Sequence, residues 1–135
     1  MSPLLLTLLF SQATIQFHLP SGLLTSVCYV ETSHKPASIH YNDGTSNSIG
    51  ICQIKLSASR QMGFKGTEAD LLDPTTNIYY AGKFLSYQLK RYKGNIPRAV
   101  TAYNKGHSSS DGNSAYYGKV YEQWKITAKE NRAAN

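Results

Sequence analysis

The stretch that decides the fold is "PSGLLTSVCYVETSHKP", residues 20–36. Its apolar residues recur at helical spacing, a proline and a serine suit the start of a helix, and a second proline marks its end. Glu31 follows Leu24 by seven positions and Cys28 by three. On a helix the three share one stripe, and we expect that stripe to face the core.

Glu31 has two interpretations at this position. A carboxylate on an apolar stripe loses hydration, which raises its pKa and suits it to proton transfer near neutral pH. The alternative is a structural acid at a helix end whose carboxylate reaches solvent. The choice between them depends on the rest of the chain.

The composition indicates one folded domain with an anionic partner. A chain of 135 residues suffices for a single core, and 16% charged with 41% hydrophobic residues is typical of a globule. The formal net charge is +6, with Lys and Arg concentrated between Lys83 and Lys129. Nucleic acid, an anionic membrane surface and the bacterial cell wall all fit this charge.

The cysteines and histidines show no metal-binding pattern. Cys28 and Cys52 are too few for a disulfide scaffold, so they are either buried thiols or one bridge between the first helix and the next element. The four histidines are scattered without a paired spacing. We expect no metal and no cofactor.

The ends of the chain define the expected domain boundaries. Residues 1–14 hold a short apolar block and a small-residue segment, so they fit a secretory signal without the basic start, or a first core helix. The block is too short to span a bilayer. We expect the domain proper at residues 15–128 and a polar tail at 129–135.

Between these ends the pattern predicts helices around one irregular region. Residues 36–48 are rich in Ser, Asn, Asp and Gly, with a turn signal at 42–44. We expect a small hairpin across 42–53, although 49–54 alone could equally begin a buried helix. Helices are predicted at 56–62, 76–92, 96–103 and 116–128, with a short turn at 67–72.

Four segments in order resemble the lysozyme-like lytic transglycosylases, the family of the soluble transglycosylase (SLT) catalytic domain. The family pattern is Glu-Ser, Gly-Leu-Met-Gln, Asn-Ile followed by Tyr-Leu, and Ala-Tyr-Asn-x-Gly. The matching segments, within residues 20 to about 121, are Glu31-Thr32, Gly50-Ile51-Cys52-Gln53, Asn77-Ile78 with Phe84-Leu85, and Ala102-Tyr103-Asn104-Lys105-Gly106. The chain departs from the pattern at Thr32, Cys52 and Ala81 and in a longer loop before Gly50.

The resemblance implies a mainly α, lysozyme-like α+β domain with a small hairpin or irregular loops beside a cleft. The implied activity is cleavage of the β-1,4 bond between N-acetylmuramic acid and N-acetylglucosamine in peptidoglycan, leaving a 1,6-anhydro sugar. Glu31 would be the acid and then the base, because the nucleophile is the sugar's own hydroxyl. A hydrolase would normally need a second carboxylate. The possible partners all lie in turn-like or capping contexts, and they are Asp43, Asp70, Asp73 and Asp111.

The resemblance also implies four substrate-binding residues, Ser48, Gln53, Tyr103 and Asn104. Gln53 would line the cleft, and Ser48 would hydrogen-bond the acid or an N-acetyl group, with His40 as a rival for that place. Tyr103 would orient the Glu31 carboxyl group, and Asn104 would end its helix and contact the sugar. The structural alternatives are a turn glutamine, a core tyrosine and a helix-ending asparagine.

Three other functions compete with the transglycosylase. They are a hydrolytic lysozyme on the same fold, a non-catalytic peptidoglycan-binding module of an envelope or phage assembly, and a nucleic-acid binder. The last is disfavoured because no nucleic-acid recognition motif appears. We expect a monomer that binds peptidoglycan glycan strands in the periplasm, in the cell envelope, outside the cell or on a virion.

Overall fold

The structure is a computed structural model that describes residues 1–36, 39–43, 46–108 and 111–134. Helices predominate, with one small antiparallel sheet, and this confirms the expected lysozyme-like α+β class. The elements in chain order are α1 Pro3–Gln16, α2 Leu23–Thr32, β1 Ile39–Asp43, β2 Ser46–Ile49, β3 Ile54–Lys55, α3 Leu56–Gln61, α4 Glu68–Leu71, α5 Pro74–Arg91, α6 Ile96–Lys105 and α7 Ala115–Ala134.

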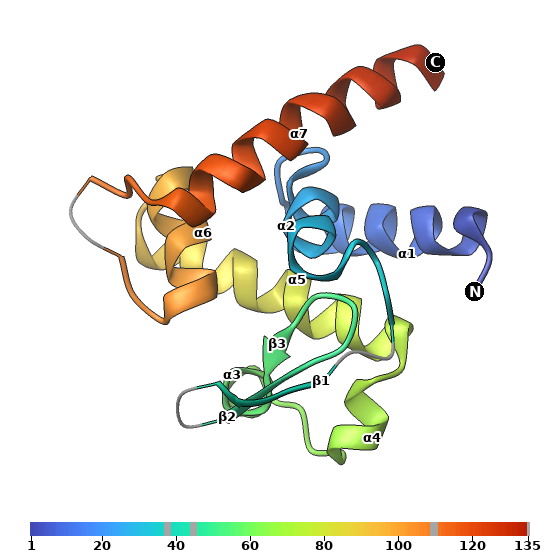
Figure 1. Cartoon of the computed structure of the whole chain (residues 1–135), viewed down its shortest axis with the longest axis vertical. Helices are drawn as coiled ribbons and strands as arrows, with labels where there is room; N and C mark the ends of the chain where they lie inside the picture. Colours follow the sequence, from blue (N-terminus) through green and yellow to red (C-terminus); the bar gives the residue numbers. More distant parts are fainter. Residues whose placement is uncertain (37–38, 44–45, 109–110, 135) are drawn as a thin grey trace.

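Helix α5 is the centre of the molecule. It crosses the middle of Figure 1, with α1, α2, α6 and α7 on one side and the sheet with α3 and α4 on the other. Asp73 caps its start by accepting a hydrogen bond from the Thr76 backbone N–H, and Pro74 occupies the first turn, where a missing N–H costs nothing. Its apolar stripe includes Ile78 and Leu85, and these side chains are buried between the two groups of elements.

Helix α1 packs on α5 through one face only. Phe10 and Ala13 are buried there, whereas Leu4 and Ile15 are largely exposed. Within the described residues, no helix is both long and apolar enough to cross a membrane.

The three strands form the expected hairpin and extend it by a third strand. β1 pairs with β2 and β2 with β3, both antiparallel, with Ile39 opposite Ile49 and Ser48 opposite Lys55. Residues 49–54 are therefore strand, turn and strand rather than the start of a helix. The turn expected at Gly44 lies outside the described residues.

Several helix ends differ from the sequence-based expectation. α2 begins after Gly22, whose left-handed backbone (φ 78°) cannot continue a helix, rather than at the preceding proline or serine. α6 passes through Asn104 and ends at Gly106, which is also left-handed (φ 87°). Residues 129–134, expected as a polar tail, continue α7.

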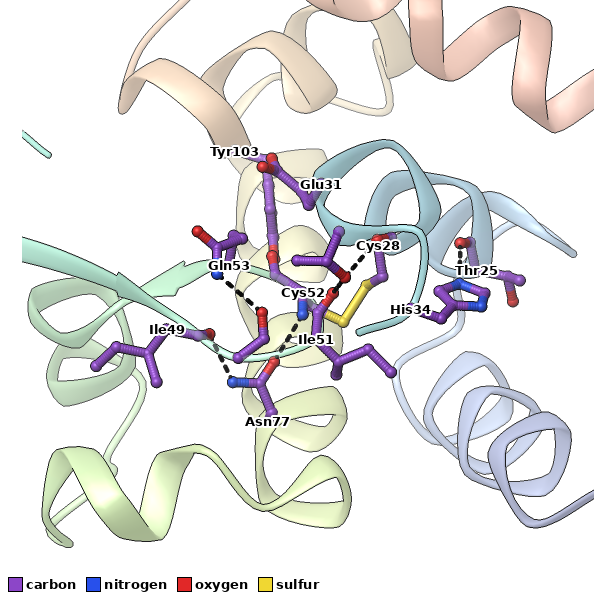
Figure 2. Close-up of a disulfide and its surroundings, with 12 residues drawn as sticks. Thr25, Cys28, Glu31, His34, Ile49, Ile51, Cys52, Gln53, Asn77 and Tyr103 are labelled. Carbon is purple, nitrogen blue, oxygen red and sulfur yellow. Dashed lines mark hydrogen bonds between the residues drawn. A yellow bond between two sulfur atoms is a disulfide. The ribbon is translucent and has the colours of Figure 1, made fainter. Parts of the chain in front are cut away.

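The turn at residues 50–53 is held from below by Asn77 of α5 (Figure 2). The Asn77 side-chain N–H₂ donates to the carbonyls of Ile49 and Leu71, both at 2.8 Å, and its oxygen accepts from the Cys52 backbone N–H at 2.9 Å. Gly50 is left-handed (φ 80°), and a Cβ atom there would lie 2.3 Å from the Asn77 amide nitrogen. The pairing of glycine and asparagine therefore fixes the path of this turn.

A disulfide ties the same turn to α2. Cys28 and Cys52 are bridged and fully buried, which settles the alternative between two thiols and one bridge (Figure 2). Cys28 lies three residues before Glu31, so the bridge fixes the last turn of α2 against residues 50–53.

Replacing Asn77 with alanine should destabilise the protein by more than about 3 kcal/mol, because it leaves two buried carbonyls and one buried N–H without their partner. Denaturant unfolding measures the loss. Asn95→Ala is the control, since it removes an exposed helix cap worth about 1 kcal/mol. A loss at Asn77 no larger than at Asn95 would contradict the role given to this amide.

Reduction of the disulfide should lower the free energy of unfolding by about 3 kcal/mol, since the bridge closes a loop with a sequence separation of 24 residues. Equilibrium unfolding with and without a thiol reductant measures the effect. The double variant Cys28→Ala/Cys52→Ala should have the same free energy of unfolding as the reduced protein, and the reductant should not change it. If the wild-type curve does not move on full reduction, the bridge contributes no stability.

Candidate functional site

Glu31 lies in the last turn of α2 and faces a hollow of about 410 Å³. It is half-buried, as the apolar stripe of the sequence predicts. The hollow is shared with the loop after α2, strand β1 and the turn at 50–53, and its lining residues are Glu31, Thr32, Lys35, Ile39, His40 and Gln53.

The Glu31 carboxylate is held by a tyrosine from the far end of the chain. The Tyr116 hydroxyl, near the start of α7, donates to Glu31 Oε2 at 2.6 Å. Burial and the neighbouring carboxylate raise the pKa of Tyr116 well above its usual range, so the hydroxyl keeps its proton and remains a donor at physiological pH. The bond fixes one rotamer of the acid.

Sequence reasoning missed Tyr116 as a site residue. It is one of ten tyrosines, and 85 positions separate it from Glu31. No periodicity within a helix reports such a long-range pairing. Its place at the start of a predicted helix, after the Ala-Tyr-Asn-x-Gly segment, was the only available signal.

Tyr103 lies in the site but its hydroxyl has a different partner from the one the resemblance implied. It is buried in α6 and donates to the Cys52 carbonyl at 2.7 Å. Burial, and after it the charge of Glu31, raises the pKa of Tyr103 well above its usual range. Tyr103 therefore supports the turn beneath the acid, and the hydroxyl that donates to Glu31 is that of Tyr116.

Gln53 faces the Glu31 hollow and also stabilises its own turn. Its backbone is left-handed (φ 50°) and its side-chain N–H₂ donates to the Gly50 carbonyl at 3.0 Å. The cleft-lining and turn-capping interpretations are thus compatible. Ser48 is buried within β2, whereas its strand partner His40 lines the hollow.

Thr32, where the family pattern has serine, retains the function of a hydroxyl. Its Oγ1 donates to the Ile51 carbonyl at 2.7 Å and accepts from the Lys35 backbone N–H at 3.1 Å. The first bond adds a second link between α2 and the turn at 50–53. Threonine carries a hydroxyl as serine does, so the departure from the family pattern still provides both of these hydrogen bonds.

Asn104 is exposed on α6 and lines a second hollow of about 330 Å³. Tyr103 also lines this hollow. The structure thus brings Gln53 and His40 to the Glu31 hollow, places Tyr103 and Asn104 at the second one, and leaves Ser48 buried in the sheet.

Three of the aspartates make hydrogen bonds within their own local segments. Asp70 accepts from the Thr67 backbone N–H in a capping box at α4, Asp73 caps α5, and Asp111 accepts from the Asn113 backbone N–H. The side chain of Asp43 lies outside the described part. Among the described residues, no group of three or more His, Cys, Asp or Glu side chains is arranged to hold a metal ion.

Comparison with known proteins identifies the family of the chain. Residues 8–125 match the family model described as "Transglycosylase SLT domain". Similar proteins include the Invasion protein IagB of Salmonella typhimurium (strain SL1344) and of Salmonella typhi, each 32% identical over an alignment of 120 residues that covers 84% of this chain and 73% of the relative. The matched span includes Glu31, both hollows and Tyr116. The chain therefore belongs to the transglycosylase SLT domain family.

Proposed function

We propose that this protein is a peptidoglycan lytic transglycosylase in which Glu31 acts first as acid and then as base. The observation that carries the proposal is the half-buried Glu31 carboxylate, which faces a hollow and is fixed by the Tyr116 hydroxyl at 2.6 Å. A fixed carboxylate in a partly dehydrated hollow is suited to proton transfer.

The proposed reaction uses one carboxyl group twice. Protonated Glu31 gives its proton to the glycosidic oxygen, and the N-acetylglucosamine side leaves as an alcohol. The 6-hydroxyl of the muramic acid residue then attacks its own anomeric carbon and returns a proton to Glu31. The 1,6-anhydro ring closes without water, and the enzyme ends in its starting protonation state.

Hydrolysis on the same fold is the second candidate. It normally needs another carboxylate across the sugar, either to activate water or to form a covalent intermediate. Within the described residues, Glu31 is the only acid that lines its hollow, and Asp70, Asp73 and Asp111 bind backbone N–H groups elsewhere. This arrangement favours the one-acid reaction.

The disulfide supports action outside the cytoplasm. Disulfides persist in oxidising compartments such as the periplasm, and the proposed substrate lies there. We therefore place the enzyme in the periplasm or cell envelope. That the enzyme acts as part of an envelope-spanning or virion assembly remains a prediction.

Glu31→Gln should abolish nearly all turnover while keeping the fold, because the amide has the same shape but cannot deliver a proton. Digestion of purified sacculi followed by mass spectrometry gives the readout: anhydro-muropeptides from the wild type and almost none from the variant. Glu122→Gln, on the exposed face of α7, is the matched control and should be fully active. Reducing ends from the wild type would identify a hydrolase, and no cleavage by the wild type would identify a binding module.

Tyr116→Phe should lower turnover about ten- to a hundredfold, because it removes one hydrogen bond to a charged group. The hydroxyl stabilises the ionised carboxylate, so its removal should raise the pKa of Glu31 and move the alkaline limb of the pH–activity profile to higher pH. Tyr117→Phe, the neighbouring residue on α7, should change neither quantity. A Tyr116→Phe enzyme with an unmoved alkaline limb would show that the bond has no catalytic role.

A further inference from the structure

The start of α7 is fixed by a chain of three hydrogen bonds that passes through Thr101 of α6. Ser114, the residue before α7, accepts from the Tyr117 backbone N–H at 3.0 Å through its Oγ. The hydroxyls of Ser114 and Thr101 are bonded at 2.8 Å, and Thr101 Oγ1 donates to the Gly112 carbonyl at 3.3 Å. Since each hydroxyl has one proton, the Thr101 proton goes to the carbonyl and the Ser114 proton goes to Thr101. Each hydroxyl in the chain therefore both donates and accepts.

The far end of this chain is anchored in the core. Thr101 is only 3% exposed, and residues 99–103 of α6 are all buried. Gly112 is also buried and left-handed (φ 67°), and a Cβ atom there would lie 2.7 Å from the Arg98 backbone nitrogen. Glycine is needed for the backbone to pass this close to the start of α6. The Gly112 carbonyl is thus held against α6, just before the chain reaches Ser114.

Tyr116, whose hydroxyl holds the Glu31 carboxylate, lies in the first turn of α7. The backbone N–H groups of a first turn have no partner within the helix, so the turn depends on its cap. Ser114 provides that cap, because it accepts from the N–H of the residue directly after Tyr116. In Figure 1 the start of α7 lies beside α6, and the two helices are in contact. The bond to Glu31 is short and charge-assisted, so it requires one position of the tyrosine.

We propose that Thr101 and Ser114 are positioning residues, which hold the Tyr116 hydroxyl at the Glu31 carboxylate by fixing the first turn of α7. This inference rests on the proposed function, because it concerns the same acid. Neither residue lines the Glu31 hollow, so each acts on the acid through Tyr116. The alternative is a helix cap that contributes stability alone. The two differ in one consequence: a positioning residue loses its effect on turnover once the Tyr116 hydroxyl is absent.

Thr101→Val keeps the shape of the buried side chain and removes its hydroxyl. We expect kcat to fall about three- to tenfold, because a small displacement of an orienting group slows the reaction. The alkaline limb of the pH–activity profile should move to higher pH, since a weaker bond from Tyr116 stabilises the ionised carboxylate less. Thr101→Ser retains the hydroxyl and should restore both quantities. In the Tyr116→Phe background, Thr101→Val should change kcat by less than about twofold.

Ser114→Ala and Thr67→Ala are a matched pair, because each removes a hydroxyl that caps the start of a helix. Both should lower the denaturant midpoint of unfolding. Only Ser114→Ala should also lower kcat and move the alkaline limb, since α4 carries no residue of the Glu31 hollow. Ser114 is less buried than Thr101, so this variant repeats the test if Thr101→Val does not fold.

The other titratable groups around Glu31 are the same in all these variants. Lys35 and His40 line its hollow, and the charge of Glu31 contributes to the raised pKa of Tyr103. A limb that moves in Thr101→Val or Ser114→Ala is therefore attributed to the bond from Tyr116.

An equal loss of turnover from Thr101→Val with and without the Tyr116 hydroxyl, or an alkaline limb that does not move, would overturn the inference and leave the proposed transglycosylase intact. If the wild type yields no anhydro products, the proposed function fails, and the pKa of Glu31 measured by carbon-13 NMR of its carboxyl group still tests the inference. Thr101→Val should raise that pKa toward its value in Tyr116→Phe. An unchanged pKa would overturn the positioning role.

Discussion

The tethering of the turn at residues 50–53 is the constraint on which the rest of the site depends. Asn77 satisfies the buried Ile49 carbonyl and Cys52 N–H of this segment and the Leu71 carbonyl of α4, and the Cys28–Cys52 bridge fastens the turn to α2. Buried backbone groups are costly to leave unpaired, so the turn has one stable path. The Thr32 hydroxyl donates to the Ile51 carbonyl of this turn, and the Tyr103 hydroxyl donates to its Cys52 carbonyl.

This arrangement explains how a short, half-buried helix can present an acid in a defined position. Three of the links just described join α2 or α6 to the turn, namely the disulfide, the Thr32 hydrogen bond and the Tyr103 hydrogen bond. The acid itself is fixed separately by Tyr116. A site assembled from α2, the turn, α6 and α7 is therefore rigid where the proposed proton transfer occurs, although its elements are far apart in sequence.

The division of roles between two tyrosines has a physical basis. Tyr103 is buried and Tyr116 is partly buried, and loss of hydration together with the charge of Glu31 raises the pKa of each and keeps each hydroxyl protonated. The Tyr103 hydroxyl donates a hydrogen bond to a backbone carbonyl, and the Tyr116 hydroxyl donates one to the Glu31 carboxylate. One hydroxyl thus supports the turn and the other orients the acid.

The local pattern of the sequence was enough to predict the mainly helical class, the long central helix, the hairpin region and Glu31 on an inward-facing stripe. Each of these depends on periodicity, caps or turn residues within a few positions of one another. The Cys28–Cys52 bridge and the Tyr116–Glu31 bond join residues that are 24 and 85 positions apart. Such pairs are set by how α2, α5, α6 and α7 pack, because a linear pattern specifies which face of a helix is buried but not which distant side chain meets it.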